Sequence, residues 1–195
     1  MEIPANYHQR LKPNRAWSLA EDGWYFEGRG RVFLTSRRAE QRLKIVDIPY
    51  AVAGILAMFT HGYRQFRTEI EIWIAPADWP KVEERFADSR YARIGTSRKF
   101  HCDQTDIEVV FCTCDTLPTS SEIIDNIPTV TLPVLIESKL IEGRNPARMA
   151  ATGDVQEMIK TLELTEAFAE KLAPAVQAEY RYHWNVIDSA PPHLL

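Results

Sequence analysis

The segment EIEIWI, from Glu69 to Ile74, constrains the fold more than any other part of this 195-residue sequence. Charged and apolar residues alternate along it, apart from Trp73. Alternation with a period of two is typical of a β-strand with one face in a core. Residues two apart on a strand point to the same side of its sheet. The segment therefore predicts a strand that carries Glu69 and Glu71 on one face.

The segments on either side alternate between helical and extended patterns. Before this strand we expect a short hairpin in the glycine-split aromatic run 23–36, a basic helix at 36–46, a strand at 47–52 and a helix at 54–59 ended by His61-Gly62. After it we expect a helix from about 78, with Pro80 in its first turn, and two strands at 92–102 and 105–114 that pair antiparallel if they form a hairpin. An extended piece at 129–135 and helices from about 133 to 188 complete the chain. Apolar residues four apart run through the last part, from Leu164 to Trp184. We therefore expect one α+β (α/β) domain over 1–195, with a small mixed sheet, flanking helices and a helical C-terminal part.

Composition and charge exclude some classes of protein. The chain is 45% apolar and 26% charged, which supports a packed core. No apolar run is long enough to span a bilayer, and the first residues lack the apolar core of a signal peptide. We expect a cytoplasmic protein with no membrane partner. The net charge of −4 does not indicate general affinity for nucleic acid. One basic stretch stands out, either as a solvated face or as a docking surface for an anionic partner: Arg29, Arg31, Arg37, Arg38, Arg42 and Lys44.

The two glutamates of the first strand repel each other unless water or a divalent cation compensates them. Hard carboxylate oxygens suit Mg²⁺ or Mn²⁺. A third acid, Glu108, lies within the apolar run DIEVVF, where a charge should face solvent, a partner or a metal. If the two strands are neighbours, Glu69, Glu71 and Glu108 can form a two-metal site, with Asp106 as the competitor for the third position. Solvated surface remains the alternative for all of them.

The stretch from Tyr50 to Ile74, YAVAGILAMFTHGYRQFRTEIEIWI, resembles the opening motif of the minimal nucleotidyltransferases. That superfamily includes the AbiEii-type toxins and the small nucleotidyltransferases of toxin–antitoxin pairs. Their pattern is a strand, a small-residue turn that opens a helix, a His-Gly that ends it, and then a basic residue, a hydroxyl residue and two acids on a strand. The later segment LPVLIESKLIEGRNPARMAATGDVQEMIKTLEL is similar to the C-terminal part of the family, with its counterparts at Lys139, Arg144, Arg148 and Asp154.

The resemblance implies a nucleotidyltransferase-type fold and a role for each matched residue. Gly54, Arg67, Thr68 and Lys139 would bind the nucleoside triphosphate, and Glu69, Glu71 and Glu108 would hold Mg²⁺ or Mn²⁺ and carry the catalysis. A nucleoside monophosphate would pass to an acceptor such as RNA, protein or a small molecule, and an antitoxin would be a further partner.

The sequence departs from this family at its acids. The family prefers Asp where this chain has Glu, and a second Gly or a Ser where it has Ala53. Because Mg²⁺ demands near-ideal octahedral geometry, an extra methylene can misplace the ion. Two alternatives to an active enzyme therefore stay open: a catalytically impaired member that acts as a binding or regulatory module, and a structural α+β protein whose glutamates face water.

Overall fold

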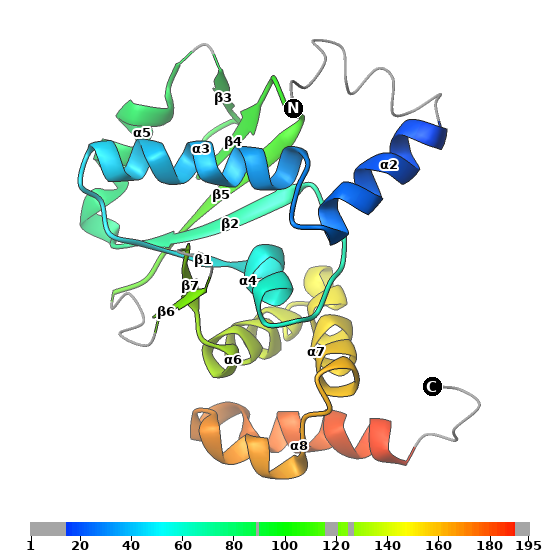
Figure 1. Cartoon of the computed structure of the whole chain (residues 1–195). Coiled ribbons are helices and arrows are strands. Elements are labelled where there is room, and N and C mark those ends of the chain that lie inside the picture. Colours follow the sequence, from blue (N-terminus) through cyan, green and yellow to red (C-terminus); the bar gives the residue numbers. More distant parts are fainter. Residues whose placement is uncertain (1–14, 89, 116–120, 125–126, 190–195) are drawn as a thin grey trace.

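The computed structural model describes residues 15–88, 90–115, 121–124 and 127–189 (Figure 1). The helices are α2 (Arg15–Phe26), α3 (Arg31–Ile45), α4 (Gly54–Thr60), α5 (Trp79–Phe86), α6 (Leu132–Gly143), α7 (Ala150–Thr161) and α8 (Pro174–Asp188), with short 3₁₀ turns η1 (Pro76–Asp78), η2 (Pro146–Arg148) and η3 (Glu166–Lys171). The strands are β1 (Tyr50–Ala53), β2 (Glu69–Ile74), β3 (Tyr91–Arg93), β4 (Lys99–Cys102), β5 (Ile107–Thr113), β6 (Ser121–Ile124) and β7 (Ile127–Val130).

The strands form one mixed seven-stranded sheet in the order β3-β4-β5-β2-β1-β7-β6. β2 pairs parallel with β5 and antiparallel with β1, so it is a central strand. Its burial alternates strictly, with Ile70, Ile72 and Ile74 fully buried and Glu69, Glu71 and Trp73 partly exposed on the other face. The expected mixed α+β sheet, and a strand over 69–74 with two unlike faces, are confirmed.

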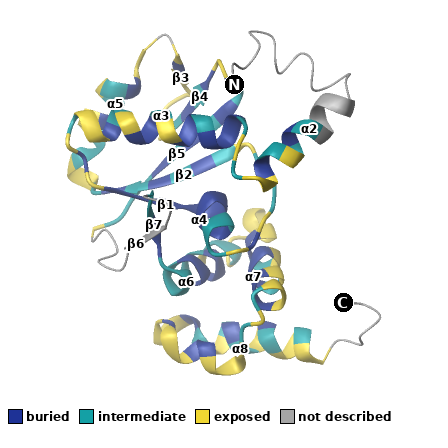
Figure 2. Cartoon of the chain, viewed as in Figure 1, coloured by how far each residue is buried: buried dark blue, intermediate teal, exposed yellow. Residues whose placement is uncertain are grey.

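Two separate cores lie on the two faces of the sheet. On one face α3 and α5 pack over the isoleucines of β2 and over Val109, Phe111 and Phe100. On the other face α6, α7 and α8 pack with α4, β1 and β7, and Figure 1 shows these C-terminal helices below the sheet. Figure 2 shows β1 and most of α4 in the buried colour, between the two layers. The acid-bearing face of β2 is therefore the face that the C-terminal helices approach.

Most expected elements are confirmed with small shifts in their ends. The helix after β1 runs over Gly54–Thr60 and ends before His61-Gly62, and α5 begins at Trp79 with Pro80 in its first turn and buries Val82 and Phe86. The single strand expected at 92–102 is wrong, because this segment folds back on itself as β3 and β4. β4 and β5 pair antiparallel, as the hairpin pattern predicted. The extended piece expected at 129–135 ends at Val130, and α6 begins at Leu132. The helical C-terminal part is also confirmed.

The hairpin expected at 23–36 is wrong. The aromatic residues before the glycines end α2, and those after them begin α3. Gly28 and Gly30 have φ values of 70° and 89°, so they form the sharp turn between two helices. A glycine pair marks such a reversal without telling whether strands or helices flank it.

Candidate functional site

The two acidic strands are neighbours, as the sequence analysis required. In the parallel pairing of β2 and β5, Glu69 lies opposite Glu108 and Glu71 lies opposite Val110. The backbone N–H of Glu108 donates to the carbonyl of Thr68 at 2.9 Å, which fixes this register at the start of β2. Glu69 and Glu108 therefore share one face side by side, while an apolar residue stands beside Glu71.

A lysine from β4 lies between Glu69 and Glu108. Lys99 Nζ is 2.8 Å from Glu69 Oε2 and 3.6 Å from Glu108 Oε2. The hydrogen bond to Glu69 and the charges of both glutamates raise the pKa of Lys99 above its usual value, against a smaller opposing effect of burial. The ammonium group thus provides a fixed positive charge at the place where the sequence predicts a divalent cation.

Glu71 has two hydrogen-bonding neighbours and a close backbone contact. The indole N–H of Trp73 donates to Glu71 Oε1 at 2.5 Å. Burial, followed by the charge of Glu71 and a hydrogen bond to it, raises the pKa of the Cys112 thiol to about 12, so the thiol stays protonated beside the carboxylate. A Cβ on Gly54 would lie 3.0 Å from both Cβ and Oε2 of Glu71. Gly54 also has φ of 57°, so this glycine allows α4 to start close against Glu71.

Basic and acidic side chains from the C-terminal helices lie in the same region. Lys139 on α6 is 7% exposed, and its Nζ lies 2.8 Å from Glu142 Oε2. Arg148 in η2 also pairs with Glu142. Burial alone would raise the pKa of Glu142, but hydrogen bonds and charge from Lys139 and Arg148 outweigh it and hold that pKa below its usual value. Lys139 and Arg148 are thus both held by one carboxylate at the edge of the site.

Arg67 connects the start of β2 to α7. Its guanidinium lies 2.5 Å from Asp154 Oδ1 and 2.9 Å from Gln65 Oε1. Asp154 is 3% exposed, and burial raises its pKa while the charges of Arg67 and Lys139 lower it to a smaller extent. Its second oxygen, Oδ2, has no hydrogen-bond partner among the described residues. The pair anchors the helical layer to the sheet at the mouth of the site.

The structure brings most of the predicted site together. A small cavity of about 30 Å³ is lined by Gly54, Ile55, Met58, Arg67, Glu69, Glu71 and Lys139. Glu108 lies beside Glu69 at the outer side of this group. Thr68 is exposed and does not line the cavity, so its place in the structure is the backbone contact to β5. Two other sequence candidates lie elsewhere, because Asp106 contacts Arg31 and Arg144 pairs with Glu179 on α8.

The carboxylates at this site can be compared with the ligands that the predicted cations need. Among the described residues, no three His, Cys, Asp or Glu side chains are grouped as a metal cage. Mg²⁺, however, is usually held by one or two carboxylates together with substrate phosphates and water, and not by an all-protein cage. Glu69 and Glu71, two residues apart on one face of β2, have the chemistry for that arrangement. The residues fit a cation that binds together with a nucleotide, provided that Glu69 releases Lys99.

Sequence reasoning missed Lys99, Glu142 and the bond from Trp73 to Glu71. A signal existed for Lys99, because it alternates with the buried Phe100 and Cys102 and so belongs on the acidic face. Its position beside Glu69 depends on the β4–β5 register, which places it opposite Val110. That register depends on the turn between the two strands and is not contained in the alternation itself.

Comparisons of the sequence with protein families and with curated proteins found no match. Among solved structures, ANT(2″)-Ia in complex with adenylyl-2″-tobramycin matches with a TM-score of 0.52 and 12% identity, over 77% of this chain and 97% of that chain. The chain has a nucleotidyltransferase-like fold. Two more structures match with TM-scores below 0.5: a protein of Thermotoga maritima assigned as a nucleotidyltransferase (0.47; 15% identity; 65% of this chain, 93% of that chain) and a solution structure of the antibiotic-resistance factor ANT(2″)-Ia (0.48; 10% identity; 81% and 93%).

The described part of the chain contains no helix of the length and apolarity needed to cross a membrane.

Proposed function

We propose that this protein is a nucleotidyltransferase that uses Mg²⁺ or Mn²⁺ to transfer a nucleoside monophosphate from a nucleoside triphosphate to an acceptor hydroxyl. The observation that carries the proposal is the cavity where Glu69 and Glu71 from β2 face Gly54, Arg67 and Lys139. Carboxylates beside cationic side chains, at the start of a helix, are what a cation–triphosphate pair requires. The nucleotidyltransferase-like fold supports the same reading.

Each residue has a task in this reaction that follows from its chemistry. Glu69 and Glu71 would hold the cation, which would neutralise charge on the triphosphate and on the leaving group. Lys139 and Arg67 would contact phosphate oxygens, although each is paired with a carboxylate in the free protein. The acceptor oxygen forms its bond to the α-phosphorus as the bond to the bridging oxygen breaks, and pyrophosphate leaves. Glu108, at the outer side of the group, would take the acceptor proton.

A second candidate is the catalytically impaired nucleotidyltransferase that serves as a binding or regulatory module. The observation that favours it is Lys99, which lies between Glu69 and Glu108. In this case the lysine replaces the cation permanently, and the site binds a nucleotide without turnover or binds none. A role within a toxin–antitoxin pair, with an antitoxin as partner, rests on the sequence resemblance to the AbiEii-type proteins.

The acceptor is the least constrained part of the proposal. RNA, a protein side chain and a small molecule all carry suitable hydroxyl groups. The adenylylated tobramycin in the ANT(2″)-Ia complex is a small-molecule example from a protein of similar fold.

Nucleotide binding and transfer test the proposal separately. Isothermal titration with each nucleoside triphosphate, in Mg²⁺ and in Mn²⁺, should show binding that is lost in the Glu69→Gln, Glu71→Gln double variant. Mass spectrometry after incubation with isotope-labelled triphosphates and a cell extract should then reveal a labelled acceptor. Binding without transfer would support the impaired module. Absence of binding with either cation would remove the transferase proposal, and would leave an impaired module that binds no nucleotide or the solvated-glutamate alternative.

The matched control is Glu83→Gln. Glu83 lies on α5, on the opposite face of the sheet, and pairs with Arg93. This variant loses one carboxylate, as each site variant does, and should bind nucleotide like the wild type.

A further inference from the structure

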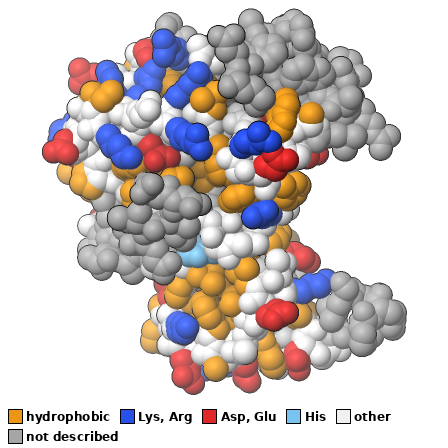
Figure 3. Space-filling model, in the orientation of Figure 1, with side chains coloured by type: hydrophobic (Ala, Val, Ile, Leu, Met, Phe, Trp, Pro, Cys, Tyr) orange, Lys and Arg blue, Asp and Glu red, His pale blue; other side chains and the backbone are white. Residues whose placement is uncertain are grey.

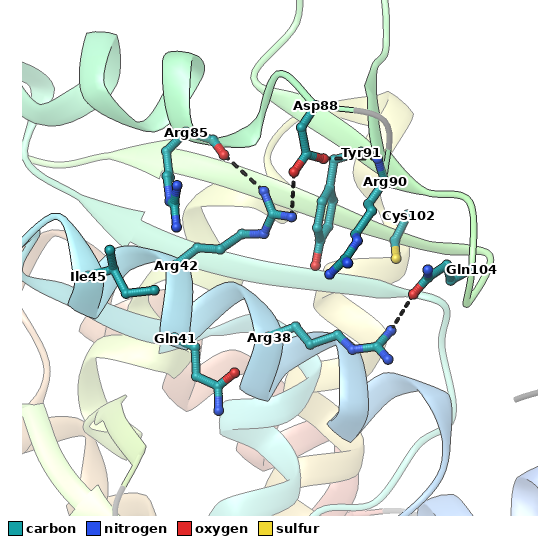
Figure 4. A pocket seen from close by; sticks show the side chains of 10 residues that line it. All are labelled: Arg38, Gln41, Arg42, Ile45, Arg85, Asp88, Arg90, Tyr91, Cys102 and Gln104. Carbon is teal, nitrogen blue, oxygen red and sulfur yellow. Dashed lines mark hydrogen bonds and ion pairs between the residues drawn. The ribbon is translucent and has the colours of Figure 1, made fainter. Parts of the chain in front are cut away.

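A second pocket lies on the opposite face of the sheet from the glutamates, between α3, the end of α5 and the β3–β4 edge (Figure 4). Its volume is about 220 Å³. Its lining includes four arginines, Arg38, Arg42, Arg85 and Arg90, and a single carboxylate, that of Asp88. Figure 3 shows Lys and Arg side chains gathered over the upper part of the molecule, where α3 runs. The lining of the pocket therefore carries a net positive charge, although the net charge of the whole protein is −4.

Internal partners account for only part of this charge. Arg42 donates to Asp88 Oδ2 at 2.6 Å and to the carbonyl of Arg85 at 2.9 Å, and Arg38 donates to Gln104 Oε1 at 2.8 Å. The other carboxylate oxygen of Asp88 accepts the backbone N–H of Arg90 at 2.9 Å. Each oxygen of Asp88 therefore already accepts a hydrogen bond. Arg85 Nε is buried without a hydrogen-bond partner among the described residues, and the side chain of Arg90 is exposed.

Two buried polar atoms at the pocket also lack a partner among the described residues. They are Arg85 Nε and the hydroxyl of Tyr91, a residue that is only 3% exposed. The polar group beside this hydroxyl is the thiol of Cys102, which forms only weak hydrogen bonds. Figure 4 shows the Tyr91 hydroxyl pointing toward α3 near the end of Arg90, with the Arg42 guanidinium between Tyr91 and Arg85. The guanidinium of Arg42 lies 4.6 Å from the centre of the Tyr91 ring and keeps that ring in place. An unpaired buried donor costs free energy that a bound acceptor recovers.

We propose that this pocket binds a phosphate group, through the guanidinium groups of Arg85 and Arg90 and the hydroxyl of Tyr91. Arginine suits phosphate because its planar fork gives two parallel hydrogen bonds to two oxygens. Pockets for drug-sized ligands usually measure about 300–1,000 Å³. The volume of this one is enough for an oxyanion head group. The phosphate comes either free in solution or as the monoester end of a larger molecule.

Titration calorimetry in EDTA with orthophosphate, pyrophosphate and O-phospho-L-serine tests this site. EDTA removes the cations that the glutamate site would need to bind phosphate. We expect saturable binding, and a loss of about tenfold or more in Arg85→Gln and in Arg90→Gln, because each removes a charge-assisted hydrogen bond. Tyr91→Phe should weaken binding as well. Either order of affinities supports the site. Tighter binding of orthophosphate indicates free phosphate as the ligand, and tighter binding of phosphoserine indicates the monoester end of a larger molecule.

Matched variants separate the pocket from general positive charge. Arg37 is an exposed arginine on α3, and it does not line this pocket. Arg37→Gln should therefore bind phosphate like the wild type. Tyr25→Phe removes another buried unpartnered hydroxyl, far from the pocket, and should leave binding unchanged. The thermal unfolding midpoint of each variant shows that it is folded.

Several results would overturn the site. One is the absence of saturable binding of any of the three ligands. Another is an Arg37→Gln variant that loses as much affinity as Arg90→Gln. A third is loss of phosphate binding in Lys139→Met, which would place the phosphate at the glutamates. Binding of an RNA oligonucleotide without binding of phosphate would indicate an extended basic surface instead.

Discussion

Replacing Lys99 by methionine should increase the affinity of the protein for Mg²⁺ and Mn²⁺. Lys99 must leave Glu69 before a cation can use that carboxylate, because its Nζ lies 2.8 Å from Oε2. Methionine keeps much of the length of the side chain and removes its charge. The aliphatic contacts with the sheet remain, so the variant isolates the electrostatic effect of the ammonium group.

The size of the effect follows from the exposure of the pairs. The side chains of Lys99, Glu69 and Glu108 are 29%, 41% and 40% exposed, so both ion pairs are screened by water. Exposed pairs are each worth about 0.2–1 kcal/mol. Two such pairs give about 0.4–2 kcal/mol, which corresponds to a gain of about twofold to thirtyfold in cation affinity.

Titration with Mn²⁺, followed by calorimetry and by the paramagnetic relaxation of bound water, measures this change directly. Lys81→Met is the control, because Lys81 is an exposed lysine on α5 that pairs with Asp78 on the other face of the sheet. Unchanged or weaker Mn²⁺ binding in Lys99→Met, with Lys81→Met like the wild type, would refute the competition between lysine and cation. The lysine would then be part of the binding site itself.

Three further changes test the framework around the site. Gly54→Ala should lower the free energy of unfolding by about 1–2 kcal/mol or more in urea titrations, since φ of 57° is unfavourable for alanine and the new methyl group meets β2; an unchanged midpoint would contradict the close approach. Arg67→Met should cost about 1–3 kcal/mol, because Asp154 stays buried with neither oxygen paired, and adding Asp154→Asn should recover most of it; equal stability of single and double variants would show that the pair is not coupled. The pKa of Glu142 is lowered in the folded protein, so its ionised form stabilises the fold at pH values above the unfolded pKa of 4.5. This contribution is lost as the pH falls through the pKa of the folded state. Glu142→Gln should therefore lose less stability than the wild type between pH 7 and pH 3, and a stability curve parallel to that of the wild type would disprove this.

Much of the sheet was predictable because its patterns are local. The alternation in 69–74 defined β2 residue by residue, and Pro80 located the first turn of α5. The apolar steps of four between 164 and 184 predicted burial well, since Phe168, Leu172, Val176 and Tyr180 are all buried. They did not predict one helix, because the chain changes from η3 to α8 at Pro174, where a helix readily starts but is not continued.

The site was predictable as far as single strands determine it. Glu69 and Glu71 share a face because of the strand period alone, and Glu108 joins them because β5 is the parallel neighbour of β2. The charges that surround them come from contacts distant in sequence, such as Lys99 with Glu69 and Arg67 with Asp154. Such contacts depend on register and on helix docking, which no local pattern contains.

The sheet carries a row of side chains from its outer edge to the glutamates. Ala92 on β3 pairs with His101 on β4, His101 with Glu108, and Glu108 with Glu69. Ala92 is exposed, and the three side chains that follow it keep partial contact with water. For the proposed transfer, a reacting hydroxyl can approach along this row from the rim of the molecule. The acceptor would then reach Glu69 from the side of Glu108 and His101, and not from the side that the C-terminal helices cover.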